Sequence, residues 1–139
     1  IEVALNMDQP ELNPSIIGVG IDLADVARID SMLKKYGNAF LEKTFAECEI
    51  LYCKKRAFPA MHFAARFAAK EAAVKALGTG FCGGITPKSV WIENDGLGAP
   101  IARFDSAFQS KMDALGAKKL CVSITHLKDY AQAIAIISR

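Results

Sequence analysis

The longest periodic pattern of apolar and polar positions lies between Pro59 and Gly80. At about 100° per residue, apolar side chains from Phe63 to Leu77 fall on one stripe of a helix, and alanines fill most of the remaining surface. Strong helix formers dominate the segment, and Gly78 begins a typical stop signal. The pattern therefore predicts a long buried helix, whose alanine back would let another element approach closely.

Four charged residues interrupt this helix where a purely structural one would carry none: Arg66, Lys70, Glu71 and Lys75. Lys70 falls on the apolar stripe, Arg66 at its edge, and Glu71 and Lys75 on one shoulder. In one interpretation Glu71 and Lys75 form an i,i+4 pair on a solvated face, worth about 0.2–0.5 kcal/mol, and the other two extend to water. In the other, the charges form a binding site.

The rest of the chain alternates between strand and helix patterns. A period of two over residues 16–23 predicts a strand with Gly18, Gly20 and Asp22 on one face, and Asp25 is a good N-cap for a following helix. Further elements are expected as a helical segment over 40–52, hairpin strands over 89–93 and 101–104, a short helix over 106–115, and strands over 120–125 and 131–137. Strands flanking helices indicate an α+β fold.

Composition limits the class of protein. With 139 residues, 52% of them hydrophobic, the chain fits one domain over residues 15–139, preceded by an extended arm over 1–14. No apolar run approaches the roughly 20 residues of a membrane span, and the start lacks the order of a signal peptide. The four cysteines have neither CxxC spacing nor scaffold density, and a net charge of +2 is too mild to indicate nucleic-acid binding. We expect a cytoplasmic protein without membrane or nucleic-acid partners.

Residue types alone allow metal-assisted phosphate chemistry. Magnesium typically takes one or two protein carboxylates plus substrate phosphates, and Asp22 and Glu71 could supply them. The two glycines near Asp22 leave room for a ligand or for another backbone. Cationic side chains on the long helix and the backbone amides of Gly78-Thr79-Gly80 would suit phosphate oxygens. His126, at a strand end, is more often a packing histidine than a catalytic one.

Several motifs together resemble a known family. They are the strand Gly18-Val-Gly-Ile-Asp22 with Arg28-Ile29, the block from Phe63 to Gly80, Ser123-Ile-Thr-His126 with Tyr130-Ala131, and the shorter matches Phe45-x-x-x-Glu49-x-x-Tyr52 and Gly98-x-Pro100. In this order they resemble holo-acyl-carrier-protein synthase, the small 4′-phosphopantetheinyl transferase, over residues 16–137. The resemblance implies a single domain in which an antiparallel sheet packs against the alanine-rich helix.

The resemblance also implies an activity. Family members move the phosphopantetheine arm of coenzyme A onto a serine of acyl carrier protein, require magnesium, and release adenosine 3′,5′-bisphosphate. They serve fatty acid biosynthesis and are homotrimers with sites shared between subunits.

Roles follow by motif position. Asp22 and Glu71 are expected to bind magnesium, either Asp22 or a metal-bound water to deprotonate the serine, and Lys75 to stabilise the departing bisphosphate. Arg28 is expected to contact the acidic carrier, with Lys34 and Lys35 nearby. The remaining positions are expected to contact coenzyme A: Arg66, Lys70, Gly78, Thr79, Gly80, Gly98, Pro100, Thr125 and His126.

Two departures from the family pattern are conservative: Thr125 stands where many relatives have serine, and Phe67 where some have tryptophan. The arm leaves open whether the chain is free-standing or part of a larger synthase. Two other functions are considered: a non-catalytic module that binds coenzyme A or a carrier, and a different magnesium-dependent pyrophosphate enzyme. Intact Asp22, Glu71 and Lys75 disfavour the first, and the lack of repeated glutamates disfavours the second.

Overall fold

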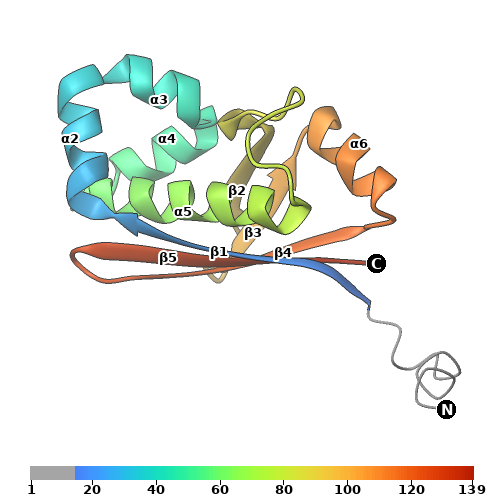
Figure 1. Ribbon diagram of the computed structural model, residues 1–139. Helices are drawn as coiled ribbons and strands as arrows, with labels where there is room; N and C mark the ends of the chain where they lie inside the picture. The colour runs from blue at the N-terminus through green and yellow to red at the C-terminus, as the bar shows by residue number, and fades with distance from the viewer. Residues whose placement is uncertain (1–14) are drawn as a thin grey trace, which may run out of the picture.

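The computed structural model describes residues 15–139, so the arm expected over residues 1–14 lies outside the described residues. Its main layer is a three-stranded antiparallel sheet in the order β1 (Ile16–Asp25), β5 (Tyr130–Ser138) and β4 (Lys119–His126). The long helix α5 (Pro59–Leu77) runs along one face of this sheet, on the same side as the other helices (Figure 1). The expected α+β fold with an antiparallel sheet is confirmed.

Close packing between α5 and β1 explains the glycines of the first strand. A Cβ atom on Gly18 would overlap the carbonyl oxygen of Ala76, and one on Gly20 would overlap that of Ala72. Only a strand without side chains at these positions can lie against the alanine face of the helix. The space beside Asp22 thus serves another backbone, and Gly78 ends the helix in the left-handed conformation with φ of 78°.

The helices that follow β1 differ from the expected elements at one point. Helix α2 (Val26–Tyr36) begins as expected at Asp25, which accepts hydrogen bonds from the next turn. The single helical segment expected over 40–52 is wrong: it forms α3 (Asn38–Thr44) and α4 (Glu47–Lys54), separated by extended backbone. The break buries the Phe45 ring fully, with its centroid 4.9 Å from the ring centroid of Phe63. It also lets Glu49 accept a hydrogen bond from the Ala46 amide at 2.9 Å.

The remaining elements follow the expected order. A 3₁₀ turn η2 (Pro87–Ser89) leads into the hairpin of β2 (Val90–Asn94) and β3 (Pro100–Phe104), and α6 (Ser106–Ala114) precedes β4. All four cysteines are unpaired, and burial raises the pKa of the Cys53 thiol to about 12. Within residues 15–139, no helix combines the length and apolar character needed to cross a bilayer.

The two faces of the main sheet differ. On β5, Ala131, Ala133, Ala135 and Ile137 are buried beneath α5. No helix of the described part of the chain lies on the opposite face (Figure 1), where these large apolar side chains are exposed: Val19, Ile21, Leu23 and Ile134. We call this surface the outer sheet face.

Candidate active site

A cavity of about 370 Å³ opens between β1, α2 and α5. Its charged lining includes four of the expected site residues: Asp22 from β1, Arg28 from α2, and Glu71 and Lys75 from α5. Apolar side chains, among them Phe67, complete the wall. The structure thus brings both expected metal ligands, the expected leaving-group cation and the expected partner contact to one place. We call it the carboxylate cavity.

Strand register and helix spacing place these groups. Asp22 pairs with Ala133, a buried position, so its side chain lies on the α5 side of the sheet. Lys75 donates from Nζ to Asp22 Oδ1 and to the carbonyl oxygen of Ile21, both at 3.0 Å. Glu71 lies one turn earlier on the same shoulder of α5 as Lys75.

The surroundings of Glu71 in this cavity disfavour its charged form. Burial, followed by the negative charge of Asp22, raises the pKa of Glu71, while Lys75 and Arg28 act in the opposite direction. A divalent cation between the two carboxylates would offset both effects. No group of three or more His, Cys, Asp or Glu residues within 15–139 is arranged to hold a metal. Two carboxylates with an open cavity nevertheless fit magnesium, which completes its shell with water and substrate phosphate.

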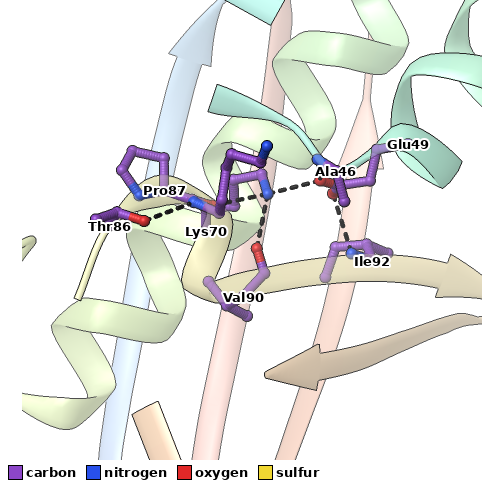
Figure 2. Close-up of polar contacts among 8 residues, drawn as sticks. Ala46, Glu49, Lys70, Thr86, Pro87, Val90 and Ile92 are labelled. Atoms are coloured by element: carbon purple, nitrogen blue, oxygen red, sulfur yellow. Dashed lines mark hydrogen bonds and ion pairs between the residues drawn. The ribbon is translucent and has the colours of Figure 1, made fainter. Parts of the chain in front are cut away.

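Lys70 was expected to contact coenzyme A, but the structure places it in an internal network. Its ammonium group is fully buried and donates to Glu49 Oε1 at 2.6 Å, Val90 O at 2.6 Å and Pro87 O at 2.9 Å (Figure 2). An ammonium group has three protons, so none remains for a phosphate. The second Glu49 oxygen accepts from the Ile92 amide at 3.0 Å. This network joins α4, α5 and the start of β2.

Arg66 lies in a second cationic cluster. Its guanidinium lies 4.0 Å from the ring centroid of Tyr52, and its Nη2 donates to Asn94 Oδ1 at 2.6 Å. His126, at the end of β4, contacts His62 of α5 with ring centroids 5.3 Å apart. We call this group, with the exposed Arg56, the arginine–histidine cluster.

The carboxylate cavity and the arginine–histidine cluster lie on different sides of α5. Arg66 and Glu71 are five residues apart, which is about 140° around a helix. Asp22 belongs to β1 and His126 to β4, the two edge strands of the sheet. Within one chain the expected site residues therefore form two groups rather than one.

The glycine loop after α5 also differs from what was expected, because its amides are already used. The Gly78 amide donates to Lys75 O and Val74 O, and the amides of Thr79 and Gly80 donate to Val74 O at 3.2 and 3.4 Å. All three amides cap the helix, so they do not form the expected phosphate cradle.

The other expected contacts, Gly98, Pro100 and Thr125, lie outside the carboxylate cavity. Asn94 Nδ2 donates to Gly98 O at 3.0 Å and Asn94 pairs with Pro100, so the hairpin turn adjoins Arg66. Thr125 pairs with the exposed Gln132 and lies on the outer sheet face, away from α5.

Comparison with known proteins agrees with this architecture. A family model described as the 4′-phosphopantetheinyl transferase superfamily matches residues 18–135. The holo-[acyl-carrier-protein] synthase of Syntrophus aciditrophicus is 42% identical over 120 residues, which are 86% of this chain and 94% of that protein. That of Protochlamydia amoebophila is 43% identical over 122 residues, 88% of this chain and 98% of its own.

Solved structures give the same result. The crystal structure of the Neisseria meningitidis holo-[acyl-carrier-protein] synthase has a TM-score of 0.82 at 31% identity, covering 89% of this chain and 99% of that one. The Helicobacter pylori enzyme, in complex with coenzyme A, has a TM-score of 0.76 at 31% identity. The match covers 86% of this chain and 99% of that one.

The chain belongs to the 4′-phosphopantetheinyl transferase superfamily. It is an enzyme of the holo-[acyl-carrier-protein] synthase type, as the family resemblance of its motifs predicts. Sequence reasoning misses His62 and Asn94 of the transferase's arginine–histidine cluster. It includes Tyr52 only by its spacing, and Arg56 only as part of the basic run Lys54-Lys55-Arg56, which would suit a polyanionic ligand or an acidic partner. The i,i+4 spacing of Tyr52 with Arg56, and of His62 with Arg66, is the signal that could have revealed Tyr52 and His62. Asn94 gives no such local signal, because its partner Arg66 is distant in the sequence.

Proposed function

We propose that the chain transfers the 4′-phosphopantetheine group of coenzyme A to a serine of apo-acyl-carrier protein in a magnesium-dependent reaction that supports fatty acid biosynthesis in the cytoplasm. Adenosine 3′,5′-bisphosphate is the second product. The observation that carries this proposal is the convergence of Asp22, Glu71 and Lys75 on one cavity beside Arg28.

Asp22 and Glu71 would hold the magnesium ion. When bound, magnesium supplies positive charge that neutralises the pyrophosphate of coenzyme A and orients it. The raised pKa of Glu71 supports this assignment, because its cause is burial and the nearby charge of Asp22, which a cation at the cavity would offset.

The chain's own groups account for the proton and the leaving group. The serine oxygen attacks the phosphorus that carries the pantetheine arm, and the bond from that phosphorus to the bridging oxygen breaks. The serine proton passes to Asp22 or to water in the carboxylate cavity. Lys75 donates one hydrogen bond to Asp22 in this structure, and its half-exposed side chain can turn to the bridging oxygen as negative charge develops there.

A homotrimer with sites between subunits is part of the proposal. The carboxylate cavity adjoins edge strand β1 and the arginine–histidine cluster adjoins edge strand β4. The exposed Val19, Ile21 and Leu23 on the outer sheet face form the kind of apolar patch that marks protein interfaces. Covering this face with a second copy would allow the β1 side of one chain to meet the β4 side of another.

The acidic acyl carrier protein is proposed to dock along α2. Arg28 is exposed and lies at the rim of the carboxylate cavity, so a carrier held there would have its serine close to the reacting phosphorus. Lys34 already pairs with Asp30 at 2.8 Å, which leaves Arg28 as the stronger candidate. Complementary charge of this kind mainly increases the association rate.

Intact-mass analysis of apo-acyl-carrier protein tests the proposal. Incubation with this protein, coenzyme A and magnesium should increase the carrier's mass by one phosphopantetheine group. Chelation of all divalent metal should abolish the increase. A carrier whose mass does not change would refute the transfer, and a gain that survives chelation would refute the metal requirement.

A further inference from the structure

Tyr52 lies between two guanidinium groups. Arg56 lies 4.1 Å and Arg66 lies 4.0 Å from the centroid of its ring. Arg66 is only 4% exposed, and its buried Nε has no hydrogen-bond partner. Neither arginine forms an ion pair with any acidic residue of the described chain. Two unpaired cations held this close to one ring indicate a site built for an anion.

His62 lies inside the same cluster. Its ring centroid is 5.3 Å from that of His126 and 6.1 Å from that of Tyr52, and both contacts are edge-on. The charged groups that act on it are all cationic: Arg66 from its own helix, Arg56 from the turn after α4, and His126 from β4. Burial is the largest cause, and these charges the next, of a pKa of His62 below its usual value.

A bound anion would favour the protonated form of His62, which burial and the neighbouring cations disfavour. Protonation of His62 adds a further positive charge to a cluster that forms no ion pair with an acidic residue in residues 15–139. A phosphate group between the arginines and His126 would supply negative charge, and the protonated imidazole would then gain favourable interactions. Ligand binding and proton uptake at His62 are therefore linked.

We propose that His62 is a specificity-determining residue of a phosphate-monoester subsite formed by Arg56, Arg66 and His126, and that it gains a proton when this subsite is filled. The inference rests on the proposed function, since the monoester it names is the 3′-phosphate of coenzyme A. His62 would thereby favour coenzyme A over its analogue without that phosphate, and more strongly at lower pH.

Nuclear magnetic resonance can read this proton directly, because the chain contains only two histidines. The full-length protein with ¹⁵N-labelled histidine is titrated from pH 5 to 8, alone and with saturating adenosine 3′,5′-bisphosphate or 5′-AMP. The His62→Phe variant retains a ring beside His126 and assigns the signals. The bisphosphate should raise the pKa of His62 by about one unit or more, which corresponds to about tenfold in affinity, and 5′-AMP should not. An equal pKa of His62 in all three samples would overturn the proposal.

Binding measurements provide a second test. From pH 6 to 8, wild-type affinity for the bisphosphate should fall relative to that of His62→Phe by up to about tenfold. With 5′-AMP the two proteins should show the same pH dependence. Taking the ratio cancels the titration of the ligand itself, and His62→Gln serves in the same way if the phenylalanine variant does not fold. A constant ratio for the bisphosphate would contradict the role of His62.

Steady-state transfer separates the two proposals. His62→Phe should increase KM for coenzyme A several-fold but leave KM for 3′-dephospho-coenzyme A at the wild-type value, whereas an increase for both substrates would contradict a subsite role. If no transfer occurs at all but the bisphosphate still protonates His62, the proposed function fails while the anion subsite stands.

Discussion

Lys70 and Glu71 are neighbours on α5, but their charged groups have opposite surroundings. Lys70 is buried and all three of its protons meet oxygen acceptors from α4 and the segment leading into β2. Glu71 faces the carboxylate cavity, where burial and Asp22 disfavour its charge. A charge whose partners are all internal stabilises the fold, whereas a charge left in an unfavourable environment is a candidate for binding.

The largest effect is expected from Lys70→Met. Removing the ammonium leaves the Glu49 carboxylate buried without its partner, and such losses typically cost about 3–5 kcal/mol. Chemical denaturation should show this loss in the free energy of unfolding, and the double variant Lys70→Met with Glu49→Gln should recover part of it. A stable single variant that has lost coenzyme A binding would instead return Lys70 to the ligand site.

Glu71→Gln should show the reverse behaviour. Turnover should fall by more than about a hundredfold, beyond the loss typical of residues that only orient a metal ligand. Circular dichroism and the melting temperature should remain close to those of the wild type. Glu42→Gln, at an exposed position of α3, is the matched control. If the two variants turn over equally well, Glu71 has no role in the reaction.

Arg28→Glu should act on the carrier and not on coenzyme A. KM for the carrier should rise up to about tenfold through slower association, and its salt dependence should become flatter. Lys118→Glu makes the same charge change at an exposed position after α6, away from α2 (Figure 1). A loss of coenzyme A binding with unchanged carrier affinity would show that Arg28 belongs to another site.

The effects of pH on activity and stability through Glu71 should be smaller than the effects of these substitutions. The raised pKa of Glu71 means that metal-dependent activity falls, as pH decreases, earlier than it would for an ordinary carboxyl near 4.3. Because the folded state binds this proton more tightly than the unfolded state, ionised Glu71 destabilises the metal-free protein above its folded pKa. Glu71→Gln should therefore melt slightly higher than metal-free wild type at pH 7. This difference should shrink toward pH 4, and one that grows on acidification would contradict the assignment.

Local patterns in the sequence predict much of this molecule. The alanine spacing predicts α5, alternation predicts β1 and the final strands, and Asp25 predicts the start of α2, because each depends on neighbouring residues. The break at Phe45 and Ala46 was missed because it depends on Glu49 and on contacts with Phe63.

The site residues show the same limit. Asp22, Glu71 and Lys75 were identified by residue type and family motif, and the fold brings them to one cavity. Lys70 was assigned to the ligand because its partners, Glu49 and the carbonyl groups around η2, are distant in sequence. Local spacing also does not show that the helix directs Arg66 and Glu71 to different sides.

The central claim is that Asp22 and Glu71 hold the divalent cation of the reaction, and manganese binding tests it most directly. Electron paramagnetic resonance should show free manganese disappearing when wild-type protein is added with coenzyme A. The same titration with Asp22→Asn or Glu71→Gln should leave the free signal largely unchanged, while Glu42→Gln should behave as the wild type. If the Glu71→Gln and Asp22→Asn variants bind manganese as strongly as the wild type does, the account is contradicted.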